Sequence, residues 1–129
     1  MPLMAVVVDD SMLIRYTVSR FLEERGYTVE SAANGLEAMA AVRRRRPDLI
    51  VTDLQMPEMS GGELITALKK EPETATVPII VVAGKAGRVG QNENRADFTI
   101  SKDIDIETEL GKALDSLHGT RTRAQAAGK

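Results

Sequence analysis

The stretch Leu-Met-Ala-Val-Val-Val-Asp-Asp-Ser, residues 3–11, decides the fold of this 129-residue chain. It is an unbroken apolar run that ends at two aspartates. A strand buried on one face alternates apolar and polar side chains, whereas a strand buried on both faces is continuously apolar. Residues 3–8 are therefore predicted to form a central strand that is covered on both sides, with Asp9 and Asp10 at its carboxyl end.

Similar apolar runs rich in Val and Ile recur along the chain and alternate with segments of helical periodicity. Strands that alternate with helices favour right-handed crossovers and a parallel sheet with helices on both faces. The sequence thus predicts an α/β fold with a doubly wound, five-stranded parallel sheet. The predicted strands are residues 3–8, 28–32, 49–52, 77–82 and 97–101.

Between these strands, apolar residues recur at steps of three and four, as on one face of an amphipathic helix. Gly26 follows the first such segment at the place of a helix C-cap, and Pro47 and Pro72 follow the second and third. The apolar positions are Ile14, Val18, Phe21 and Leu22; Leu36, Met39 and Val42; Leu64, Ile65 and Leu68; and Ile106, Leu110, Ala113, Leu114 and Leu117.

Two segments depart from this pattern. Residues 84–96 contain three glycines, two asparagines and a single large apolar residue, Val89, so we expect a loop in place of the fourth helix. Residues 119–129 have three basic residues, no acidic residue and no large apolar residue. We expect one domain over residues 1–118 and a disordered basic tail over residues 119–129.

Composition excludes several classes of function. Seventeen basic and 19 acidic residues give a net charge of −2, which argues against a nucleic-acid partner held by bulk charge. The absence of Cys excludes disulfides and thiolate metal sites. The apolar runs are too short to span a bilayer, and residues 3–8 have no basic segment before them. We therefore expect a cytoplasmic protein with no membrane partner.

Charged residues gather where the predicted strands end. Asp9 and Asp10 follow the first strand, Asp53 the third and Lys102 the fifth. Ligands of doubly wound sheets bind at carboxyl strand ends where the winding direction switches. Clustered carboxylates need compensation, which Mg²⁺ supplies, and a lysine supplies a point charge to a phosphate. Acids after strands also occur as helix caps and turn residues, but this arrangement on three strands favours phosphoryl transfer with a carboxylate nucleophile.

These residues resemble a known family. Residues 7–11 (Val-Val-Asp-Asp-Ser), residues 53–61 (Asp-Leu-Gln-Met-Pro-Glu-Met-Ser-Gly) and Lys102 are similar to the motifs of the receiver domain of bacterial two-component response regulators. The resemblance covers residues 3–118. It implies a flavodoxin-like three-layer sandwich, and the chain length is similar to that of a single-domain, CheY-like regulator.

The resemblance implies a role for each charged residue. Asp53 is the expected phosphoacceptor, with a sensor histidine kinase or a phosphotransfer protein as donor. Asp10 and Asp53 are the expected ligands of Mg²⁺ (or Mn²⁺), with Asp9 acting largely through water. The backbone carbonyl of Gln55 is the expected third protein ligand, and Lys102 is expected to contact the phosphoryl oxygens.

The resemblance also implies that the chain is not an enzyme acting on other molecules. A receiver catalyses only its own phosphorylation and dephosphorylation and signals by a change of conformation. Gln55 and Lys85 are expected to flank the phosphoryl group and tune its hydrolysis. We expect a monomer or weak dimer, and the sequence does not name the downstream target.

The chain departs from the family at the end of the fourth strand and on the fifth. Ala83 stands where receivers carry Thr or Ser, so no hydroxyl is available, although the backbone N–H of Gly84 could contact the phosphoryl group. Thr99 stands where receivers carry an aromatic residue, and Phe98 is one step earlier, on the opposite face of the strand.

Two alternatives follow. The altered switch positions would also suit a phosphorylation-independent pseudo-receiver that acts as a protein-interaction module. A phosphatase of the haloacid dehalogenase type would need an Asp two residues after its nucleophile, but Ser11 and Met12 occupy those positions after Asp9 and Asp10.

Overall fold

Strands and helices alternate through the part of the chain that the computed structural model describes: residues 3–54, 59–83, 96–101 and 105–127, with 118–127 as backbone only. The elements are β1 (Leu3–Val8), α1 (Met12–Glu24), β2 (Tyr27–Ala32), α2 (Gly35–Arg44), β3 (Leu49–Thr52), α3 (Gly61–Lys70), β4 (Ile79–Ala83), β5 (Phe98–Ser101) and α4 (Ile106–Ala127).

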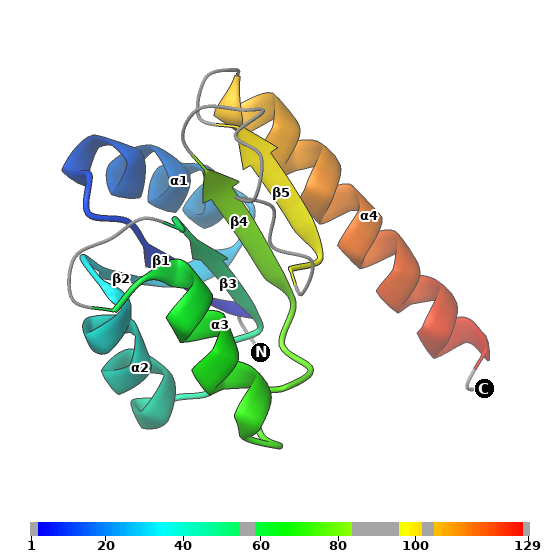
Figure 1. Cartoon of the computed structure of the whole chain (residues 1–129). Helices are drawn as coiled ribbons and strands as arrows, with labels where there is room; N and C mark the ends of the chain where they lie inside the picture. The colour runs from blue at the N-terminus through cyan, green and yellow to red at the C-terminus, as the bar shows by residue number, and fades with distance from the viewer. Residues whose placement is uncertain (1–2, 55–58, 84–95, 102–104, 128–129) are drawn as a thin grey trace.

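The five strands form one parallel sheet in the order β2-β1-β3-β4-β5. The chain passes from β1 to β2 on one side and then returns to β3 on the other side of β1, so the winding direction switches between β1 and β3. Figure 1 shows α2 and α3 on one face of the sheet and α1 and α4 on the other. The predicted doubly wound α/β fold is confirmed.

The central strands are buried on both faces, as their continuous apolar sequence predicts. In β1, Met4, Val6 and Val8 pack with α2 and α3, whereas Ala5 and Val7 pack with α1 and α4. The strands β3 and β4 divide their side chains between the same two layers. Two apolar cores, one on each side of the sheet, therefore hold the carboxyl ends of β1 and β3 in fixed positions.

Two aspartates, Asp48 and Asp97, make the same pair of hydrogen bonds to a neighbouring strand. Asp48 precedes β3; its backbone N–H donates to the Met4 carbonyl (2.7 Å), and its Oδ2 accepts from the Met4 N–H (2.8 Å). Asp97 precedes β5 and makes the same pair of bonds with Ile79, each of 2.8 Å. Each aspartate thus closes the hydrogen-bonding ladder at the amino end of a parallel pair.

Side chains and a glycine define the ends of the helices. Ser11 and Asn34 cap α1 and α2. Ser60 and Glu63 form a reciprocal capping box at the start of α3. Gly26 follows α1 with a φ of 95°, a conformation that glycine adopts without strain, at the position predicted for a C-cap.

The last helix is longer than the sequence predicts. It continues to Ala127, and Figure 1 shows its final turns projecting away from the sheet. The backbone of residues 119–127 is thus helical, where we expect a disordered tail. The physical reason is that Ala, Arg and Gln are good helix formers and extend a helix already anchored by Leu110 and Leu114.

The predicted loop in place of a helix between β4 and β5 concerns residues 84–95, which lie outside the described residues. The helix labelled α4 follows β5. Within the described ranges, no helix combines the length and the apolarity that crossing a membrane requires.

Candidate functional site

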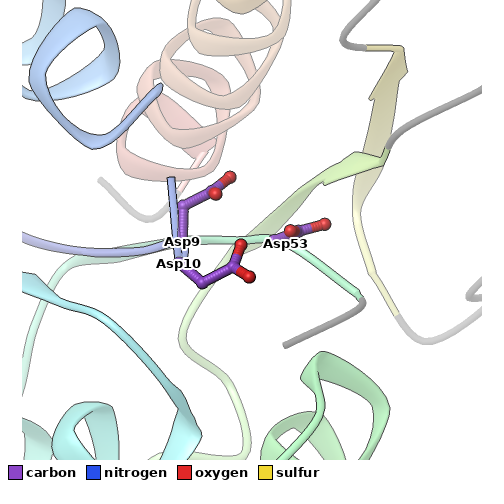
Figure 2. A group of neighbouring side chains, drawn as sticks. All are labelled: Asp9, Asp10 and Asp53. Carbon is purple, nitrogen blue, oxygen red and sulfur yellow. The ribbon is translucent and has the colours of Figure 1, made fainter. Parts of the chain in front are cut away.

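Three aspartates meet at the carboxyl ends of β1 and β3. Asp9 and Asp10 follow β1, and Asp53 follows β3. The two strands are neighbours in the sheet, and the Asp53 N–H donates to the Val8 carbonyl (2.9 Å). One carboxylate oxygen from each of the three aspartates lies within 4.8 Å of the corresponding oxygens of the other two. Figure 2 shows the side chains of Asp9, Asp10 and Asp53 as neighbours.

Asp9 is fixed from three directions. It is 2% exposed, and its backbone N–H donates to the Ala32 carbonyl at the end of β2 (3.1 Å). Its Oδ1 accepts from the Ser11 N–H (2.8 Å), which closes the turn into α1. Its backbone carbonyl accepts from Nη1 of Arg15 in α1 (2.7 Å). The first acid of the pair is therefore part of the rigid framework.

Asp53 is also buried, at 5% exposed, and its surroundings are equally ordered. Its Oδ1 accepts from the Leu54 N–H (2.7 Å), and its backbone carbonyl accepts from Oγ1 of the fully buried Thr52 (2.8 Å). A Cβ on Gly61 would lie 2.0 Å from that carbonyl oxygen. Only glycine lets α3 begin this close to Asp53.

Asp10 differs from the other two because it is exposed. It is the member of the cluster whose side chain solvent reaches. Three carboxylates at this separation repel one another, and a divalent cation removes the repulsion. The donor set consists of carboxylate oxygens, the hard ligands that Mg²⁺ prefers, and thus fits such an ion.

The other predicted site residues divide into two groups. Ala83 ends β4 and packs against the core on the α2 and α3 side. Thr99 is exposed on β5, whereas Phe98 packs into the opposite core, so the two side chains lie on different faces as expected. Gln55, Gly84, Lys85 and Lys102 lie outside the described residues.

Two residues that shape the site are missed by sequence reasoning. In the sequence, Thr52 is simply the last residue of an apolar strand. Its hydroxyl bonds to the Asp53 carbonyl because it is buried, which the sequence does not indicate. Arg15 is one of two basic residues on α1, and no spacing rule distinguishes it from Arg20. Only the contact of Arg15 with the Asp9 carbonyl sets it apart.

The comparisons with known proteins agree with this fold. Residues 5–115 match the response regulator receiver domain. The chain belongs to this family. Receiver domains are signalling domains. This is the family that the segments 7–11 and 53–61 resemble.

The relatives include both short and long proteins. Protein PilH of Pseudomonas aeruginosa is 32% identical over 109 residues, which cover 81% of this chain and 89% of PilH. The gliding motility regulatory protein of Myxococcus xanthus is 33% identical over 119 residues, but the match covers 89% of this chain and only 15% of that protein. The solved structure of chemotaxis response regulator CheY4 of Vibrio cholerae has a TM-score of 0.77 and 30% identity, covering 92% of this chain and 98% of that one.

Proposed function

We propose that this receiver accepts a phosphoryl group on Asp53 from a histidine kinase or a phosphotransfer protein, in a reaction that needs Mg²⁺. The observation that carries the proposal is the meeting of three carboxylates within 4.8 Å at the switch point of the sheet. Family membership supports it, because Asp9, Asp10 and Asp53 all lie within the matched residues 5–115.

The chemistry follows from a buried carboxylate that is held in place. A carboxylate oxygen of Asp53 attacks the phosphorus of a phosphohistidine. The P–O bond forms as the P–N bond breaks, and the imidazole nitrogen leaves with the electron pair. The product is an acyl phosphate on Asp53, which water later hydrolyses to inorganic phosphate and the free carboxylate. The domain therefore acts on its own phosphorylation state and on no other substrate.

The remaining residues take supporting roles in this proposal. Asp10 and Asp53 would hold Mg²⁺ directly, with the Gln55 carbonyl as a further ligand, and Asp9 would act through water. The ion supplies positive charge that offsets the charge on the phosphoryl oxygens. Lys102 and the Gly84 N–H would contact the same oxygens, and Gln55 and Lys85 would set the rate of hydrolysis.

One observation favours a second candidate function. Ala83 has no hydroxyl to contact a phosphoryl group, and Thr99 provides no aromatic ring on β5. A pseudo-receiver that binds a partner protein without being phosphorylated would tolerate both changes. The two functions differ in whether Asp53 is chemically modified.

Intact-mass measurement after incubation with acetyl phosphate and Mg²⁺ separates them. We expect one labile phosphoryl adduct on the wild type and none on Asp53→Asn or in EDTA. Asp105→Asn is the matched control because Asp105 is an exposed acid at the start of α4, bonded by Thr108, and this variant should keep the adduct. An unmodified wild type that also fails to bind beryllofluoride at Asp53 would favour the pseudo-receiver.

A further inference from the structure

An arginine of α1 contacts the backbone of the acidic pair. Nη1 of Arg15 donates to the carbonyl oxygen of Asp9 at 2.7 Å, and this contact is partly buried. That carbonyl belongs to the peptide group that joins Asp9 to Asp10. A charged donor on a carbonyl makes a stronger bond than a neutral one, so the guanidinium restrains the orientation of this peptide plane.

We propose that Arg15 is a positioning residue for the cation site, because it holds the Asp9–Asp10 peptide in the orientation that presents both carboxylates to a metal ion. The inference rests on the proposed function, in which these carboxylates bind a divalent cation. It assigns a role to a side chain that itself offers no ligand atom to a cation.

Asp10 depends on this contact more than Asp9 does. Asp9 is also held by the Ala32 carbonyl and the Ser11 N–H. Asp10 lies beyond the end of β1 and is exposed, so its direction follows from the peptide that precedes it. Loss of the Arg15 contact should therefore leave Asp9 close to its place and release Asp10.

A second arginine on the same helix provides a comparison. Arg15 and Arg20 both line a groove of about 380 Å³, together with Tyr16, Glu23 and Ser31. Arg20 bonds the Tyr16 hydroxyl (3.0 Å) and pairs with Glu24 (3.5 Å), so its contacts stay on α1. Replacing Arg20 removes the same charge from the same groove without touching the acidic pair.

The two possible roles of Arg15, as a nearby charge and as a positioning residue, predict opposite changes in cation affinity when Arg15 is replaced. Removing a positive charge beside three carboxylates strengthens cation binding if charge is all that matters. Removing a group that orients a metal ligand weakens cation binding. The loss is about tenfold for groups that bond to the ligand and not to the metal itself. The direction of the change thus identifies the role of Arg15.

The experiment is a Mn²⁺ titration at constant ionic strength, in which electron paramagnetic resonance measures the binding of the ion. It compares the wild type with Arg15→Met, Arg15→Lys and Arg20→Met, each first shown to be folded by urea unfolding. We expect binding about tenfold weaker in Arg15→Met, partial recovery in Arg15→Lys, whose ammonium can reach the same carbonyl, and wild-type binding in Arg20→Met.

Each other outcome is decisive. Folded Arg15→Met that binds Mn²⁺ as tightly as the wild type, or more tightly, overturns the inference and leaves the proposed function intact. If Arg15→Met does not fold, Arg15→Gln replaces it in the comparison with Arg15→Lys, and equal affinities of these two variants overturn the inference. A wild type that does not bind Mn²⁺ overturns the cation step of the proposed function and this inference with it.

Discussion

A single methyl group added at Gly61 would collide with the backbone that carries the proposed phosphoacceptor. The added Cβ would lie 2.0 Å from the Asp53 carbonyl oxygen and 2.8 Å from the Leu54 Cα. Both are backbone atoms, so the start of α3 and the end of β3 must move apart. We expect Gly61→Ala to lower the free energy of unfolding by about 1–3 kcal/mol, as overpacking does, in urea denaturation.

Gly111→Ala is the control for that measurement. It adds the same methyl group to a helix, where the nearest atom is Nη2 of Arg25, the end of a flexible side chain, at 3.3 Å. Its stability should stay near that of the wild type. Equal stabilities of the two variants would contradict the close approach seen at Gly61.

Asp10 is the acid whose charge can be removed with the least structural loss. It is exposed, whereas Asp9 and Asp53 are buried. Without a metal, Asp10→Asn relieves repulsion among three carboxylates. We expect Asp10→Asn in EDTA to unfold at a higher urea concentration than the wild type, a gain of up to about 1 kcal/mol. A clear loss of stability would show that Asp10 supports the fold.

The acids of the site could be predicted because each one follows an apolar strand whose end lies at the switch point. Arg15 and Thr52 could not be predicted, because their contacts with the Asp9 and Asp53 carbonyls depend on side-chain direction and burial. Sequence spacing carries neither property. The chemical roles of the acids stay predictions until phosphorylation is measured.

At the scale of the elements, β5 depends on the bonds of Asp97 with β4. Asp97→Ala removes the acceptor of the Ile79 N–H, a bond of 2.8 Å at a fully buried residue. We expect a loss of about 1 kcal/mol and faster hydrogen exchange at the Ile79 amide. Asp97→Asn keeps an acceptor oxygen and should retain protection. Unchanged exchange in Asp97→Ala would contradict this role.

The presence of the strands was easier to predict than the residues at which they start or the length of the last helix. Continuous apolar runs locate β1 and β3 at their observed bounds, whereas β4 begins at Ile79, after Pro78, rather than at Val77. Proline has no N–H to donate to a ladder, which fits this later start. The helical backbone of residues 119–127 was missed because low apolarity indicates disorder only where no packed helix precedes the segment.

At the scale of the whole molecule, a cation that binds only the folded state must stabilise it. Asp53 lies far along the sequence from the adjacent Asp9 and Asp10, so the unfolded chain does not reproduce the site. Free Mg²⁺ at ten times its dissociation constant should add about 1.4 kcal/mol to the free energy of unfolding. Thermal unfolding at constant ionic strength should show a rise in Tm for the wild type and a smaller rise for Asp10→Asn. Equal rises would place the ion elsewhere.

The central claim is that Asp53 carries the phosphoryl group, and chemical trapping tests it most directly. Sodium borohydride reduces an aspartyl phosphate to homoserine, which peptide mass mapping then locates in the sequence. After treatment with acetyl phosphate and Mg²⁺, we expect homoserine at position 53 alone, and none when EDTA is present. Homoserine at position 9 or 10, or none at all despite a phosphoryl adduct, would contradict the claim.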